Sequence, residues 1–310
     1  MSHENNKLIT GAKDHKVMIF SGKGGALKQE KSIDFGDFPC RGIDNHNGKI
    51  LLGLRDGSIY ELNESDLEGP KKQIMASHHD GEAWGLAIVP QSKSLLSIGD
   101  DNKILEFDFD EKKFIKQGII SEKSSKNQDK MKKVTASSMS QYPANQQGRA
   151  IAFCPHNNHI AVSNNMGKVT IRPRDDLNKK LHVLNHADEW NEVIRYSPCG
   201  KYMAVGSHDN RIYVYETANN YSLYYTCDKH NSFVTSVDWS LDSTYIRSVC
   251  GAYEKLYYNI AEKSFDSSGL SNTKDTQWAS NSAKIGWDVE GIYPSGEDGS
   301  HINGVDMTTD

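Results

Sequence analysis

The sequence predicts an all-β repeat fold, and three observations support this prediction. Short β-rich runs are joined in pairs by tight polar turns, the pairs recur at a nearly constant spacing, and no long stretch shows the apolar periodicity of a helix. The recurring units are residues 8–20, 50–62, 95–107, 160–171, 203–215 and 246–258.

The spacing of these units identifies the kind of repeat. One residue marks the turn of each unit, in order Asp14, Asp56, Asp101, Met166, Asp209 and Tyr253, and successive markers lie 42, 45, 65, 43 and 44 residues apart. Four of these gaps match the 40–45-residue blade of a WD-type β-propeller. We therefore expect residues 1–310 to form a single WD-repeat β-propeller, or most of one, with about six blades present.

Each unit has the pattern of short antiparallel strands. In the run from Arg211 to Glu216, Ile212 and Val214 fall on one face and Tyr213 and Tyr215 on the other, which is typical of a strand packed between blades. The turns carry Asp-Gly, Asp-Asn or Asp-His, residues that accept the positive φ angles of tight hairpins.

Residues 118–147 account for the long gap. They are polar, rich in Lys and Ser and nearly free of large apolar residues, so we expect an insertion between two blades. Its lysines, among them Lys130, Lys132 and Lys133, outnumber its acids. The segment is therefore either a solvated loop or a contact with an acidic partner surface.

Histidines stand 22 or 23 residues before two of the turn aspartates, His79 before Asp101 and His186 before Asp209. We expect each histidine to hydrogen-bond its aspartate inside the blade, often through a Ser or Thr, because buried polar groups need partners. For His230 the equivalent turn position is Ala252, so the sixth unit must hold its turn differently.

Composition and motifs exclude several classes of function. The net charge of −5 argues against a nucleic-acid partner, and no apolar run approaches the eighteen residues of a membrane span. Five scattered cysteines and a polar N-terminus favour a reducing, intracellular compartment. The glycine-rich run 21–25 lacks the spacing of a phosphate-binding loop, and His78, His79 and Asp80 lack a further metal ligand. We predict no catalytic, cofactor or metal site, and hence a binding scaffold rather than an enzyme.

Four segments resemble the echinoderm microtubule-associated protein-like family: residues 78–108, 188–216, 230–258 and 275–306. The last contains a D-x-x-W element and a G-x-Y-P-x-G-x-D-G-x-x-I-N run, which are not general features of WD repeats. The resemblance corresponds to most of the second of two tandem propellers. It implies association with tubulin or microtubules, and with other microtubule-associated or ciliary proteins, in the cytoplasmic cytoskeleton or the ciliary axoneme. A propeller adaptor for non-tubulin partners is the alternative.

The sequence departs from this family in the sixth unit, where Ala252 replaces the usual Asp and Tyr258 the usual Trp. The 310 residues also include no counterpart of the family's first propeller or of its N-terminal coiled coil. The chain opens on an apparent second strand and ends on an apparent first strand. Two interpretations stay open: a piece of a longer polypeptide, or a six-bladed ring closed by its own tail.

Partner-binding residues of a propeller are expected in the loops that crowd one rim, before the first strand and after the second strand of each blade. The candidates there are Arg41, Trp84, Arg149, Trp190, His208 and Phe233. Large aromatic side chains at such positions can anchor a partner. Alternatively, Trp84 and Phe233 pack between blades.

Overall fold

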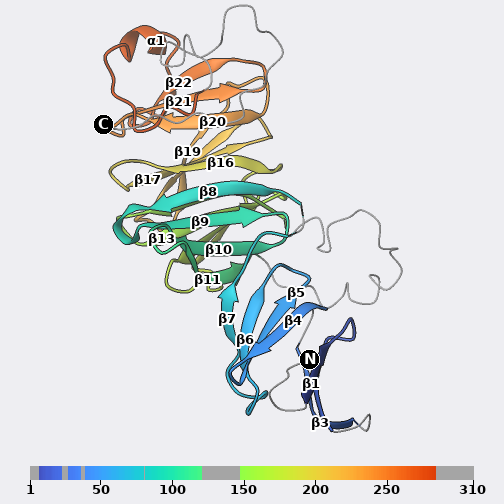
Figure 1. Ribbon diagram of the computed structural model, residues 1–310. Coiled ribbons are helices and arrows are strands. Elements are labelled where there is room, and N and C mark those ends of the chain that lie inside the picture. Colours follow the sequence, from blue (N-terminus) through green and yellow to red (C-terminus); the bar gives the residue numbers. More distant parts are fainter. Residues whose placement is uncertain (1–6, 23–26, 36–38, 80, 121–146, 284–310) are drawn as a thin grey trace, which may run out of the picture. The chain divides into compact units, whose positions relative to one another are not determined.

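The structure is a computed structural model in which residues 7–22, 27–35, 39–79, 81–120 and 147–283 are described (Figure 1). The described residues within 1–81 and 105–117 form one compact unit, and those within 82–104 and 118–310 form another. Among the described residues the only helices are the short η1 (Pro90–Ser92) and α1 (Gly269–Asn272). None of the helices in these ranges has the length and apolar character to cross a membrane.

In the described ranges the strands form six sheets in which each strand pairs with the next along the chain. The first sheet has three strands and the others four. The sheets are β1 (Lys7–Gly11), β2 (Lys16–Ser21) and β3 (Lys28–Asp34); β4 (Cys40–His46), β5 (Lys49–Leu54), β6 (Ile59–Asn63) and β7 (Lys72–Met75); β8 (Ala83–Val89), β9 (Ser94–Gly99), β10 (Lys103–Asp108) and β11 (Lys113–Ile119); β12 (Gly148–Cys154), β13 (His159–Asn164), β14 (Val169–Pro173) and β15 (His182–Leu184); β16 (Asn191–Tyr196), β17 (Tyr202–Ser207), β18 (Ile212–Glu216) and β19 (Ser222–Cys227); β20 (Val234–Trp239), β21 (Tyr245–Cys250), β22 (Lys255–Asn259) and β23 (Ser264–Phe265).

This order of strands is that of propeller blades, so the predicted all-β WD-repeat fold is confirmed. In the second unit the apolar cores lie between consecutive sheets. One cluster joins Ile171 of β14 to Met203 of β17 and Tyr215 of β18, and others join β9 to β13 and β17 to β20. Burial between thin sheets explains how a chain with only 36% hydrophobic residues builds several small apolar cores.

The turn aspartates lie where the spacing predicted. The carboxylates of Asp14, Asp56, Asp101 and Asp209 each accept a hydrogen bond from the backbone N–H two residues later, at 3.1–3.2 Å. This side-chain bond mimics a backbone turn and therefore stabilises each hairpin. In the fourth unit Asn164 plays this part, with the N–H groups of Met166 and Lys168 as its donors.

The predicted bond between His186 and Asp209 is wrong. Oδ2 of Asp209 instead accepts the hydroxyl of Tyr213 at 2.7 Å and the N–H of Asp188 at 3.0 Å, while Nδ1 of His186 lies 3.2 Å from the hydroxyl of Tyr215. Two tyrosines on β18 thus separate the histidine from the carboxylate. The corresponding pair of His79 with Asp101 stays a prediction.

The segment predicted as an insertion begins later than residue 118. β11 extends to Ile119, and Ile120 is buried. Arg172 of β14, itself fully buried, donates from Nη1 to the carbonyls of Ile119 (2.7 Å) and Leu177 (2.5 Å) and from Nη2 to that of Ile120. Residues 118–120 therefore belong to the packed structure. The candidates Lys130, Lys132 and Lys133 lie outside the described residues.

Candidate functional site

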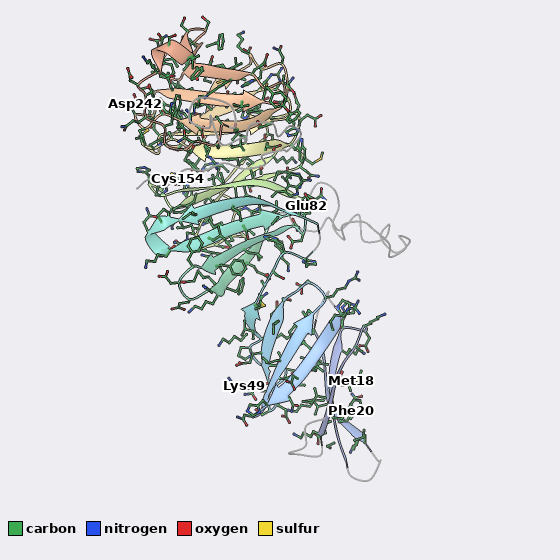
Figure 2. The ribbon with its side chains drawn as sticks, turned by 45° about the horizontal axis from the view of Figure 1, so that its top comes forward. Met18, Phe20, Lys49, Glu82, Cys154 and Asp242 are labelled. Carbon is green, nitrogen blue, oxygen red and sulfur yellow. The ribbon has the colours of Figure 1, made fainter. Side chains whose placement is uncertain are left out.

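Five of the predicted binding residues come from four successive sheets of the second unit. Trp84 and Arg149 are the second residues of β8 and β12, Trp190 and Phe233 immediately precede β16 and β20, and His208 immediately follows β17. β12 lies beside β8 and β16, and β16 lies beside β20. Figure 2 shows Glu82, just before β8, on one side of these sheets, with Cys154 and Asp242, at or after the ends of β12 and β20, on the other. The five residues therefore lie on the side of the sheets at which β8, β12, β16 and β20 begin.

These five side chains form one continuous stack, here called the aromatic ladder. The guanidinium of Arg149 lies over the rings of Trp84 and Trp190, at 4.5 and 4.8 Å from their centroids. Trp190 contacts His208 edge-to-face at 4.3 Å, and His208 stacks on Phe233 at 4.6 Å. Edge-to-face and cation–π contacts of this kind are each favourable by about 0.5–1.5 kcal/mol, so the ladder is held in one arrangement.

Carboxylates fix the two basic members of the ladder. Asp100 accepts Nη1 of Arg149 at 2.6 Å, Nε1 of Trp84 at 3.1 Å and the N–H of Glu82 at 3.0 Å. Burial raises the pKa of the Asp100 carboxyl, but these hydrogen bonds outweigh it and hold the pKa below its usual value. The second carboxylate is that of Glu192, whose Oε2 lies within hydrogen-bonding distance of Nε2 of His208, at 2.6 Å.

The ends of the ladder remain open to solvent although its middle is packed. Trp84 is 40% exposed and Phe233 is 39% exposed, whereas the Arg149 side chain is only 10% exposed. A cavity of about 240 Å³ borders the ladder and is lined in part by Trp84, Arg149 and Glu192. Rigid, half-exposed aromatic side chains beside a cavity are typical of interface anchors, since little conformational entropy is lost when a partner covers them. Arg41 is exposed on β4 in the first unit.

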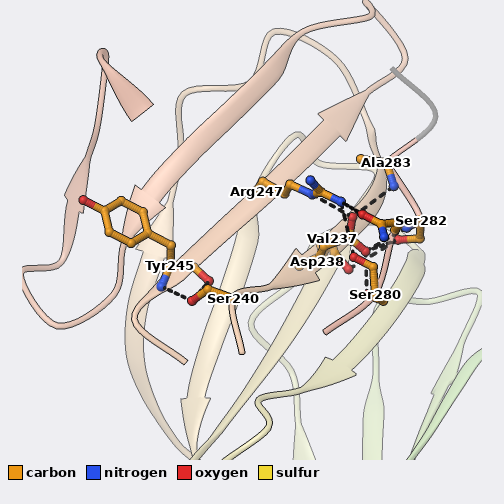
Figure 3. Close-up of polar contacts among 9 residues, drawn as sticks. Val237, Asp238, Ser240, Tyr245, Arg247, Ser280, Ser282 and Ala283 are labelled. Carbon is orange, nitrogen blue, oxygen red and sulfur yellow. Dashed lines mark hydrogen bonds and ion pairs between the residues drawn. The ribbon is translucent and has the colours of Figure 1, made fainter. Parts of the chain in front are cut away.

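A second feature of this unit is a polar anchor for the segment after β23, which the sequence reasoning missed. Asp238 of β20 is fully buried. It accepts hydrogen bonds from Nε of Arg247 (3.1 Å), from the hydroxyls of Ser280 (2.6 Å) and Ser282 (2.7 Å), and from the N–H groups of Ser282 (2.9 Å) and Ala283 (3.1 Å), as Figure 3 shows. An acid within the apolar run of a strand was the available signal, since a buried carboxylate requires partners.

The backbone completes this anchor. The N–H of Leu241 donates to the carbonyl of Gln277, and the N–H of Ala279 donates to that of Trp239, both at 2.8 Å. Trp278, the tryptophan of the D-x-x-W element, stacks against the guanidinium of Arg247 at 4.4 Å. The element thus attaches the segment 275–283 to the edge of the last sheet.

The sixth turn is held by Glu254, as expected of a unit that lacks the turn aspartate. Its carboxylate accepts hydrogen bonds from the backbone N–H of Asn231 at 2.9 Å, from the side-chain amide of Asn231 at 2.5 Å and from the thiol of Cys250 at 3.3 Å. Hydrogen bonds from Asn231 lower the pKa of Glu254. His230 is buried and lies 2.7 Å from the hydroxyl of Ser248; burial lowers its pKa to about 4.

A family model described as the echinoderm microtubule-associated protein second β-propeller matches residues 83–310. The chain belongs to this family. The match includes the aromatic ladder, the sixth turn and the anchored segment 275–283, so the resemblance predicted from the sequence is confirmed.

Relatives share the same region of larger proteins. The ciliary WD repeat-containing protein ctxp80 of Euplotoides octocarinatus is 45% identical over 98% of this chain and 41% of its own length. The 77 kDa echinoderm microtubule-associated protein of Lytechinus variegatus is 32% identical over 96% of this chain and 40% of its own length. The chain therefore spans about two fifths of these relatives. The structure of Chaetomium thermophilum Sqt1 bound to the N-terminus of ribosomal protein L10 aligns with a TM-score of 0.48 at 17% identity, covering 84% of this chain and 70% of that one.

Proposed function

We propose that this chain is a microtubule-associated WD-repeat scaffold that binds tubulin or the microtubule lattice through the aromatic ladder. The observation that carries the proposal is the stacking of five side chains from four sheets into one line whose two ends are exposed. The target is inferred from the family, whose relatives are named as microtubule-associated proteins. The name of the Euplotoides relative supports a place in cilia.

The ladder favours a protein partner over a small molecule because it is a line of anchors rather than an enclosed pocket. Trp84 and Phe233 stand at its two ends, each about two fifths exposed. Exposed aromatics next to paired charges are the usual composition of protein–protein hot spots. Lys130, Lys132 and Lys133 provide a second, electrostatic contact in this proposal, and it would weaken with salt.

Co-sedimentation with microtubules tests the proposal. The double variant Trp84→Ala/Phe233→Ala removes both exposed anchors, and we expect at least about tenfold weaker binding, since each hot-spot truncation costs about 1–2 kcal/mol or more. The matched control is Phe109→Ala/Phe265→Ala, because these aromatics are 43% and 36% exposed outside the ladder. The control should bind like the unaltered chain.

Charge reversal of Lys130, Lys132 and Lys133 to Glu separates the two contacts. One outcome is that the charge-reversal variant loses binding at low salt while Trp84→Ala/Phe233→Ala binds like the unaltered chain. In that case the contact is electrostatic and the ladder is not the binding surface. If the unaltered chain binds neither microtubules nor tubulin dimers, the proposal fails and the chain is better described as an adaptor for other proteins. A fluorescently tagged chain in a ciliated cell would show whether it enters the axoneme.

A further inference from the structure

Three different metal-ligating side chains meet at the sixth turn. His230 lies in the loop before β20, Cys250 is the last residue of β21, and Glu254 immediately precedes β22. One ligand atom from each lies within 4.8 Å of the other two, and this is the one such group of three in the ranges that the structure describes. His230 and Cys250 are buried, whereas the Glu254 side chain is 30% exposed.

The imidazole of His230 has a ring nitrogen whose hydrogen-bonding capacity is unused. Its side chain is fully buried, and Nδ1 has no hydrogen-bond partner; the nearest carboxylate oxygen, Oε2 of Glu254, is 3.8 Å away. Nε2 lies 2.7 Å from the hydroxyl of Ser248. Buried polar atoms are nearly always satisfied, so an open nitrogen that faces a carboxylate and a thiol requires an explanation.

We propose that His230, Cys250 and Glu254 form a zinc site that clamps the sixth turn. Imidazole nitrogen, thiolate sulfur and carboxylate oxygen are the ligands that Zn²⁺ takes in proteins, and the mixture of soft and hard atoms suits it better than Mg²⁺ or Ca²⁺. Solvent supplies the fourth ligand through the exposed side of Glu254.

The distances are close to those that a tetrahedral ion needs. Bonds of 2.0–2.3 Å to zinc place neighbouring ligand atoms about 3.3–3.8 Å apart. The separation of Nδ1 from Oε2 is 3.8 Å, and that of the Cys250 sulfur from Oε2 is 3.3 Å. The sulfur-to-nitrogen separation is at most 4.8 Å, so a bound ion would draw these two atoms together by no more than about 1 Å.

The surroundings also match those of a metal ligand. A zinc-bound histidine usually donates its other ring N–H to a fixed acceptor, and the hydroxyl of Ser248 stands at that position for Nε2. On binding, the Cys250 thiol loses its proton to solvent and the thiolate sulfur coordinates the ion. The ion would then join the loop before β20, the end of β21 and the turn into β22, where a WD unit otherwise uses a single aspartate.

Metal titration of the untagged 310-residue chain, stripped with a chelator, tests the proposal. We expect one Zn²⁺ per chain by elemental analysis. With Co²⁺ as the spectroscopic probe, we expect a thiolate-to-cobalt charge-transfer band together with the visible bands of tetrahedral coordination. Cys250→Ser should abolish the charge-transfer band, whereas Cys199→Ser, which removes an exposed cysteine outside the cluster, should leave it unchanged.

Two further variants guard against misfolding as an explanation. Glu254→Gln keeps an oxygen for Asn231 but loses the charge. Ser248→Ala removes only the group that orients His230, so the Zn²⁺ affinity of the Ser248→Ala chain should fall by roughly 10- to 100-fold. Circular dichroism of each variant shows whether the fold is retained. The proposal is overturned if the unaltered chain takes up no more Zn²⁺ than Cys250→Ser, or if its cobalt spectrum lacks the thiolate band.

Discussion

The anchor around Asp238 yields the most quantitative prediction. The substitution Asp238→Ala removes a carboxylate that is 0% exposed and leaves the Arg247 side chain, 3% exposed, without its ionic partner. Removing one member of a buried ion pair costs about 3–5 kcal/mol, because the remaining charge stays desolvated. The hydrogen bonds to Ser280, Ser282 and Ala283 are lost in the same step.

For a unit of this size, each kcal/mol lowers the melting temperature by about 2–4 °C, so Asp238→Ala should lower it by roughly 6–20 °C. The assay is thermal denaturation followed by circular dichroism. Limited trypsin digestion adds a local readout, because detachment of the segment 275–283 should speed cleavage after Lys274. A matched control is Asp188→Ala, which removes a carboxylate that is 84% exposed and 3.8 Å from Arg211. That change should shift the melting temperature by about 1–2 °C or less.

If Asp238→Ala melts within about 2 °C of the unaltered chain and is digested at the same rate, the anchor does not hold the segment. The double variant Asp238→Asn/Arg247→Met should be less destabilised than the sum of its two single changes, since no unpaired charge remains. A strictly additive result would contradict the coupling between the two residues.

Three further predictions concern other parts of the second unit. Arg172→Lys should destabilise it by about 2–3 kcal/mol in urea denaturation, because a lysine cannot reach three carbonyls at once; an unchanged midpoint would contradict this role. Burial, and then the neighbouring His182, lower the pKa of His159 below the ordinary 6.5, so the folded state resists protonation. The contribution of the neutral His159 to the free energy of unfolding is complete above pH 6.5 and declines as the pH falls through the folded-state pKa. A plot of the denaturation midpoint against pH should therefore be flatter for His159→Gln than for the unaltered chain. Parallel curves would be inconsistent with this. In Gly251→Ala the new methyl group would lie 2.5 Å from the Phe233 ring, so partner binding should weaken with little change in secondary structure by circular dichroism, whereas unaltered binding would show that the position of Phe233 does not matter.

Local patterns predicted most of the fold. Asp56 and Asp209 mark turns because their carboxylates bond backbone groups two residues away, a relation that a short stretch of sequence already contains. Strand alternation around Ile212 and Tyr213 predicted β18 for the same reason. The ladder residues could be named from their expected places near one rim, but the loop placement is wrong for Trp84 and Arg149, which lie within β8 and β12. The position of Arg149 between two tryptophans could not be predicted either.

The remaining features depend on contacts between distant residues. Asp238 bonds Ser282, 44 residues later in the chain, and nothing in the local pattern names that partner. Glu254 replaces the turn aspartate from a position two residues beyond Ala252, so a fixed spacing does not find it. His186 was assigned to Asp209 by spacing, but Tyr213 reaches the carboxylate instead.

Hydroxyl-radical footprinting of the chain, free and on microtubules, tests the central claim most directly. It reports the solvent access of individual aromatic side chains, and Trp84, Phe233, Phe109 and Phe265 start from comparable exposures of 36–43%. If the ladder binds the lattice, microtubules protect Trp84 and Phe233 and leave Phe109 and Phe265 unchanged. Protection of the two control residues alone, or no protection of any of the four, would contradict the assignment of the aromatic ladder as the microtubule-binding surface.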